Sequence, residues 1–150
     1  MSSFRVAVVS LLVLTGIASA QTSRRKEAAA PADAVSVDAI VSALYASVSH
    51  AADASPDFDR MRRIFHYVGM LVPPKAPDAA DFRVLDVDQF AERWEKSLAA
   101  RKEKGQPAAG FFEREVARRT DCFGNICQLF STYEARHSPS DAAPFQRGIN

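Results

Sequence analysis

The two cysteines of the chain, Cys122 and Cys127, lie five positions apart and are compatible with a disulfide, a redox-active pair or a metal site. A metal site is disfavoured because two thiols are too few ligands for structural zinc, and the nearest suitable histidine, His137, lies ten residues further on. Redox catalysis is disfavoured because the spacing is not Cys-x-x-Cys and no predicted helix begins beside the thiols. We therefore expect a structural disulfide.

Two pairs of carboxylates, Asp57 with Asp59 and Asp86 with Asp88, have a spacing that suits shared acid–base work. Each pair also stands at the predicted start of a helix, where carboxylates cap backbone N–H groups and face the positive end of the helix dipole. Because capping accounts for both pairs, neither is a leading catalytic candidate.

Composition and charge narrow the functional classes. The 150 residues are 47% hydrophobic and 25% charged, which is ordinary for one globular domain. The formal net charge is only +1, so we expect no nucleic-acid partner. The sequence contains no phosphate-binding glycine loop, zinc-protease motif or nucleophile elbow. We expect neither a metal nor a cofactor.

The cysteines belong to a predicted β-hairpin. Two extended runs, residues 113–120 and 127–134, meet near Gly124 and Asn125, a pair that tolerates positive φ and favours a two-residue loop. With that loop the two cysteines are opposed as a non-hydrogen-bonded pair, whose Cα atoms approach to about 4.5 Å, within reach of a disulfide.

The same register predicts the neighbours of several charged and aromatic residues. It places Val116 opposite Tyr133 and Glu113 opposite Arg136, both favourable cross-strand pairs. The charges between residues 113 and 119 are then expected to form a solvated strand face with cross-strand ion pairs.

Periodic apolar residues predict the helices that support this hairpin, at residues 37–52, 56–65 and 87 to about 101. Ser36 and Asp86 are the expected N-caps, and Gln89 completes a capping box with Asp86. Two short strands are expected at residues 70–72 and 82–85.

Residues 1–20 have the form of a signal peptide: Arg5 precedes an apolar run over residues 6–17, and Ala18-Ser19-Ala20 forms a cleavage site. The run of about 12 residues is too short to cross a bilayer. We expect cleavage before Gln21, a periplasmic or secreted location, and no stable membrane insertion afterwards. Residues 21–35 are expected to form a flexible leader, and residues 36–150 one domain.

The pattern resembles the nuclear transport factor 2-like (SnoaL-like) superfamily, in particular exported bacterial members of uncharacterised role. The likeness runs from about Val37 to Asn150 and rests on residues 38–41, 58–61, 86–90, 112–116, 123–126, 130–134 and 147–150. The resemblance implies an α+β fold shaped like a cone, in which a curved mixed sheet, as in cystatin-like folds, packs on N-terminal helices and leaves a pocket. In such proteins residues like 147–150 begin a long strand followed by another, so we expect a C-terminally incomplete domain with an exposed strand edge.

Within such a cone, the resemblance implies a ligand pocket lined by polar and aromatic side chains, namely Tyr45, Trp94, Arg114 and Tyr133. Core packing is an alternative for Trp94, and ion pairing for Arg114. His66 and Tyr67 are candidates for a catalytic base and donor, although consecutive residues of a strand point to opposite faces.

These features favour an exported domain that binds a small apolar ligand or interacts with another protein. A homodimer through the sheet is a further expectation, since superfamily members often dimerise in this way. The alternative is a cofactor-independent isomerase, dehydratase or cyclase of the SnoaL-like type.

Overall fold

The computed structural model describes residues 31–75 and 78–150. Within these ranges the chain forms four helices followed by three strands, so the predicted α+β class is confirmed. The predicted signal peptide, and the predicted leader as far as residue 30, lie outside the described residues.

The strands form an antiparallel sheet in the order β1-β2-β3. They span Phe112–Phe123 (β1), Ile126–Arg136 (β2) and Gln146–Ile149 (β3). Both pairings are antiparallel, so the described part of the sheet is not the mixed sheet that the resemblance implied. The predicted Gly124–Asn125 loop joins β1 to β2, and Gly124 adopts a φ of 60°, which glycine tolerates without strain.

The predicted hairpin register holds only next to the loop. It is correct from the pair Phe123–Ile126 as far as Ala117–Thr132, where a β-bulge inserts one extra residue into β1. Beyond the bulge Tyr133 lies opposite Glu115 rather than Val116, and Arg136 lies opposite Phe112 rather than Glu113. Both predicted pairs are therefore wrong by one residue.

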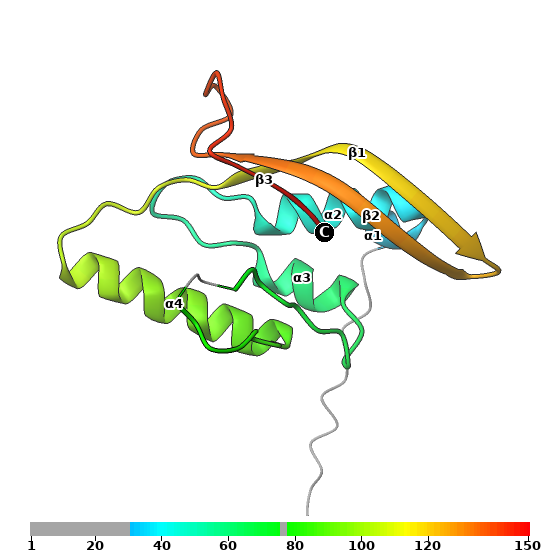
Figure 1. The fold of residues 1–150 in the computed structure, drawn as a ribbon, viewed down its shortest axis with the longest axis horizontal. Coiled ribbons are helices and arrows are strands. Elements are labelled where there is room, and N and C mark those ends of the chain that lie inside the picture. The colour runs from blue at the N-terminus through cyan, green and yellow to red at the C-terminus, as the bar shows by residue number, and fades with distance from the viewer. Residues whose placement is uncertain (1–30, 76–77) are drawn as a thin grey trace, which may run out of the picture.

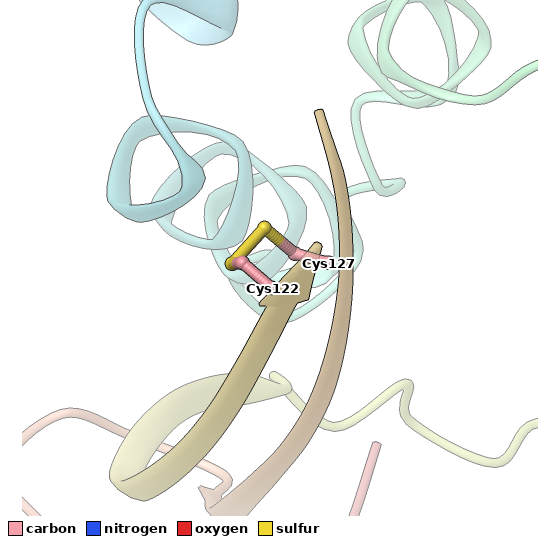
Figure 2. Close-up of a disulfide and its surroundings, with 2 residues drawn as sticks. All are labelled: Cys122 and Cys127. Carbon is pink, nitrogen blue, oxygen red and sulfur yellow. A yellow bond between two sulfur atoms is a disulfide. The ribbon is translucent and has the colours of Figure 1, made fainter. Parts of the chain in front are cut away.

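The expected disulfide joins Cys122 and Cys127 at the tip of this hairpin (Figure 2). The sulfur atoms are 2.10 Å apart and the Cα atoms 4.1 Å apart, which is the close approach expected of a non-hydrogen-bonded pair. The bond links β1 to β2 next to the loop, where otherwise the turn alone would hold the two strands together.

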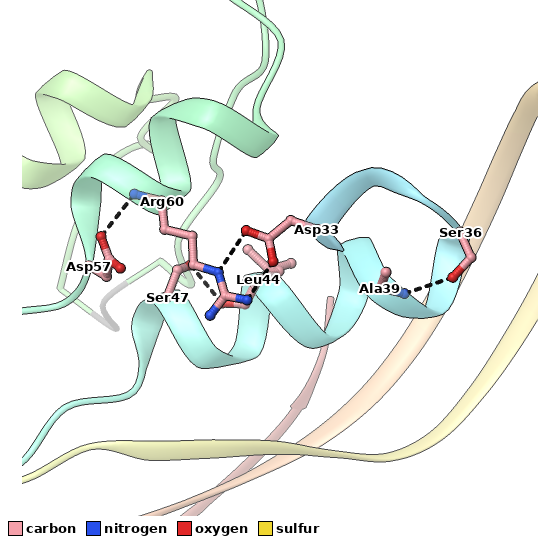
Figure 3. A network of polar contacts seen from close by, with 7 residues as sticks. All are labelled: Asp33, Ser36, Ala39, Leu44, Ser47, Asp57 and Arg60. Carbon is pink, nitrogen blue, oxygen red and sulfur yellow. Dashed lines mark hydrogen bonds and ion pairs between the residues drawn. The ribbon is translucent and has the colours of Figure 1, made fainter. Parts of the chain in front are cut away.

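The first three helices along the described chain are α1 (Pro31–Ala34), α2 (Val37–Val48) and α3 (Phe58–Ile64). The two longer ones are shorter than predicted, and α2 ends where Ser49 turns extended. The α1 turn occupies the last residues of the predicted leader. Its buried Asp33 accepts hydrogen bonds from Arg60 of α3 at 2.6 and 3.0 Å (Figure 3), so this turn is held against the domain.

The longest helix, α4 (Val87–Glu103), begins with the predicted capping box. The Asp86 carboxylate accepts from Gln89 N at 2.7 Å, and Gln89 Oε1 accepts from Asp86 N at 3.0 Å. The two strands predicted before this helix are wrong, because only Leu71 and Leu85 pair, as an isolated bridge. Pro73 and Pro74 stand two and three positions after Leu71 and supply no N–H to extend a ladder.

Two hydrophobic clusters hold these elements together, and α2 contributes to both. One joins α3 to α4 through Phe58, Met61, Val87 and Ala91, with Val48 of α2 packed against it. The other joins α2 to β2 through Val41, Tyr45 and Tyr133. Figure 1 shows all the helices on one side of the sheet, which arches over α2. None of the helices in the described ranges has both the length and the hydropathy needed to span a bilayer.

Candidate functional site

Two of the predicted pocket residues, Tyr45 and Tyr133, meet beneath the sheet. Both are buried, Tyr45 on α2 and Tyr133 on β2. The Tyr45 hydroxyl lies 2.7 Å from Ser131 Oγ. Because Ser131 donates its own proton to Glu115, Tyr45 must donate to Ser131. The result is a directed chain of hydrogen bonds from α2 through β2 to β1.

Tyr133 is oriented by β3. Its hydroxyl accepts a hydrogen bond from Gln146 Nε2 at 2.7 Å, which leaves the phenolic proton free to be donated. Burial raises the pKa of Tyr133, so the phenol stays protonated at neutral pH. Gly148 lies so close that a Cβ there would stand 2.7 Å from the Tyr133 ring. Any larger residue at position 148 would force the Tyr133 ring to move, so glycine allows β3 to pack closely over this ring.

Glu113 lies on a different face of β1 from the one that the sequence predicted. We expected a solvated strand face, but the side chain is partly buried, and burial raises its pKa to about 7. Its carboxyl makes no hydrogen bond or ion pair with the residues that the structure describes. It shares a face with Glu115 and Tyr133, since the alternation along β1 places residues 113 and 115 together.

The β-bulge explains this error. Without it Val116 would lie opposite Tyr133 and face α2, and Arg114 would follow it on the same face. The extra residue shifts the register by one, which turns each side chain of that part of β1 to the other face. Glu113 and Glu115 consequently point towards the helices.

Arg114 accordingly lies on the opposite, outer face of the sheet from Tyr133. Its Nε donates to Glu134 at 2.7 Å, and this is one of the cross-strand ion pairs that the sequence led us to expect. Glu134 also pairs with Arg136, and these two arginines lower its pKa. Arg114 therefore does not share a pocket with the two tyrosines.

Trp94 lies elsewhere, on α4, beside a cavity of about 650 Å³ that is open to the surface. The cavity is lined by both apolar and polar side chains. Leu85 and Phe90 are apolar, and the polar and charged side chains of α4 are Gln89, Glu92, Arg93, Lys96 and Ser97. Lys96 pairs with Glu92 at 2.6 Å, whereas Arg93 makes no ion pair with any residue in the described ranges. The cavity thus has an aromatic and aliphatic wall and one uncompensated cation.

The indole of Trp94 also contacts His50, which is buried at the end of α2. The two rings meet edge to face with their centroids 4.7 Å apart. Trp94 Nε1 and His50 Nε2 are both buried and have no hydrogen-bond partner among the described residues. An unpaired buried polar group costs about 1–3 kcal/mol, so packing these two rings together carries a local energetic cost. Both interpretations of Trp94 fit, because it packs against the core and lines a cavity.

His66 and Tyr67 lie on a turn after α3 and not on a strand. Their rings are 4.3 Å apart, so the backbone does bring them together, but the Tyr67 side chain is 80% exposed. His66 Nδ1 accepts from Val68 N at 3.4 Å within the same turn. Both side chains of the pair are thus exposed to solvent.

Two further findings concern the whole set of candidates. The described residues include no group of three or more His, Cys, Asp or Glu side chains that is arranged to hold a metal ion. The chain matches no family model, and no curated protein and no solved structure matches it.

Proposed function

We propose that this protein is an exported domain that binds a small ligand in the cavity beside Trp94. The observation that carries the proposal is the cavity itself, whose volume of about 650 Å³ falls within the range of small-molecule sites in proteins. Export is supported by the signal-like residues 1–20 and by the Cys122–Cys127 disulfide, since such bonds persist in oxidising compartments. The resemblance to nuclear transport factor 2-like proteins remains part of this proposal, supported by helices gathered under an arched sheet.

The lining defines the chemistry of the ligand. Leu85, Phe90 and Trp94 suit an apolar, flat body, because aromatic faces stack favourably. Arg93 suits an anionic or carbonyl oxygen on the rim of the same molecule. We therefore propose a small aromatic compound that bears one acidic group.

Fluorescence tests this proposal directly, because Trp94 is the single tryptophan of the chain. The probe is 8-anilino-1-naphthalenesulfonate, which has an aromatic body and one anionic group. We expect saturable binding with energy transfer from Trp94 to the probe. Arg93→Gln is expected to weaken binding about fivefold to tenfold, the effect of losing one charge-assisted hydrogen bond.

The matched control is Arg101→Gln, which removes the same charge from the last turn of α4 outside the cavity. Its affinity for the probe should equal that of the wild type. Non-saturable binding, or equal weakening by both substitutions, would contradict a site at Trp94.

A second candidate function is proton transfer at Glu113, which corresponds to the isomerase, dehydratase or cyclase alternative. It is favoured by one observation: a partly buried carboxyl with a pKa near 7 shares a face with the proton-donating hydroxyl of Tyr133. A base poised near neutral pH beside a hydroxyl donor suits removal of a proton next to a carbonyl group. Titration of the Glu113 carboxyl, followed by carbon-13 NMR, tests this candidate, and a midpoint near 7 is the expected result.

A further inference from the structure

The outer face of the sheet is uncovered. All the helices lie on the other side (Figure 1), and three large apolar side chains of the outer face, Val116, Phe130 and Ile149, are each more than half exposed. Exposed apolar groups gathered on one surface are typical of sites that contact another molecule.

The same face carries an excess of positive charge around a single carboxylate. Glu134 is buried under three arginines, Arg114, Arg136 and Arg147. Arg136 is nearly covered, and its Nε donates to the Asp141 carbonyl at 3.0 Å. The side chains of Arg114 and Arg147 are 68% and 71% exposed. Glu134 therefore positions two guanidinium groups at the surface, and its single negative charge cannot neutralise all three arginines.

The arginines and the apolar side chains are spaced regularly. Arg147 and Ile149 stand two residues apart on β3, and β3 pairs them with Glu134 and Thr132 of β2. Residues two apart on a strand share a face and lie about 7 Å from one another. An extended segment with an acidic and an apolar side chain two residues apart would match both groups at once.

We propose that the outer face of the sheet docks an acidic segment of a partner protein, whose carboxylates bind Arg114 and Arg147 and whose apolar side chains pack on Phe130 and Ile149. Guanidinium groups bind carboxylates through paired hydrogen bonds of matching geometry. This surface lies across the sheet from the helices and is separate from the cavity beside Trp94, so the two proposals stand independently.

Charge argues against a second copy of the chain as the occupant. The outer face has four arginines (Arg114, Arg119, Arg136 and Arg147) against two acids (Asp121 and Glu134), as the strand alternation assigns them. A two-fold axis through this face would bring the same patch of both copies together and set like charges against one another. A partner that carries the opposite charge avoids this repulsion.

The test uses the full chain and a labelled peptide that repeats Glu-Thr-Val-Thr, whose extended form places glutamate and valine on one face. Fluorescence anisotropy should show saturable binding. Arg114→Gln with Arg147→Gln should weaken it at least about tenfold, and Lys at both positions should restore part of the affinity. The control pair Arg83→Gln with Arg101→Gln removes equal charge elsewhere and should leave affinity unchanged.

Several outcomes would overturn the proposal. If a Gln-Thr-Val-Thr peptide bound as tightly as the Glu-Thr-Val-Thr peptide, the carboxylates would have no role in binding. If the variant with glutamine at positions 114 and 147 bound the peptide as tightly as the wild type, the arginines would have no role. Arginine-dependent binding of phosphatidylglycerol vesicles or of an oligonucleotide, without binding of the peptide, would assign the face to another class of partner. If sedimentation showed that the wild type is a dimer and the Phe130→Asp variant a monomer, the face would be assigned to contact with a second copy of the chain.

Discussion

Two glutamates on neighbouring strands show how position decides the behaviour of one residue type. Glu113 faces the helices, and burial without a hydrogen-bond donor raises its pKa to about 7. Glu134 faces outward, and hydrogen bonds from Arg136 and Arg114 lower its pKa. The difference follows from their partners, because desolvation disfavours a carboxylate and a guanidinium stabilises it.

This contrast predicts an effect of pH on stability through Glu113. Between the ordinary pKa of 4.5 and the folded value of about 7, the folded chain binds more protons than the unfolded chain, so stability falls as the pH rises through this window. Glu113→Gln should therefore be more stable than the wild type by about 1–2 kcal/mol near pH 8, and the two proteins should be equally stable near pH 4. The expected difference includes a reduction for solvent screening, because the Glu113 side chain is partly exposed. Urea unfolding at both pH values measures this difference.

Glu103→Gln, at the exposed end of α4, is the control and should show no such dependence on pH. Carbon-13 NMR of the glutamate carboxyls should give a midpoint near 7 for Glu113. A midpoint near 4.5 would refute both the pH effect and the proton-transfer candidate.

At the scale of elements, the β1–β2 hairpin is defined by two local features. The disulfide closes its tip, and the bulge near Val116 sets which side chains face α2. The tip has little other support, since the Phe123 side chain is 90% exposed and Ile126 is also exposed. The pairing of the two strand ends there depends on the turn and on the covalent bond.

Removal of the disulfide tests this dependence. Cys122→Ser with Cys127→Ser should lower the free energy of unfolding by about 2 kcal/mol, the value expected for a short loop released from its cross-link. Denaturant unfolding of both proteins measures it, and a reducing agent should destabilise the wild type only. Two free thiols by mass spectrometry, in protein isolated from an oxidising compartment, would show that the bond does not form.

At the scale of the whole molecule, the fold has two hydrophobic clusters joined by α2. Val41 and Tyr45 of α2 pack towards the sheet, and Val48 packs towards α3 and α4. Met61 has no exposed surface and lies within the α3–α4 cluster. The helical part, which includes the cavity beside Trp94, is thus stabilised separately from the sheet.

Met61→Ala should therefore affect the two parts unequally. The loss of a fully buried side chain costs about 2–5 kcal/mol, and hydrogen exchange should become faster in α3 and α4 than in β2. Met70→Ala, at an exposed position, should change stability by less than about 0.5 kcal/mol. Equal acceleration at every amide would show that the two clusters unfold as one unit.

Local chemistry determined the elements that the sequence predicted correctly. Ser36 and Asp86 mark helix starts because a side-chain oxygen there satisfies a free backbone N–H. Gly124 and Asn125 mark the hairpin loop, and the register next to that loop paired the cysteines. Each of these features depends on residues close together in the chain, so the amino-acid sequence alone is enough to predict it.

Only the tertiary structure decided which side chains meet. No sequence signal marks the bulge, yet that one residue turned Arg114 outward and Glu113 inward, and so separated the expected pocket residues. Trp94 reached a cavity apart from Tyr45 and Tyr133 because α4 packs on α3 and not on the sheet. Side chains alternate with a period of two along a strand, so a shift of one residue reverses every later assignment.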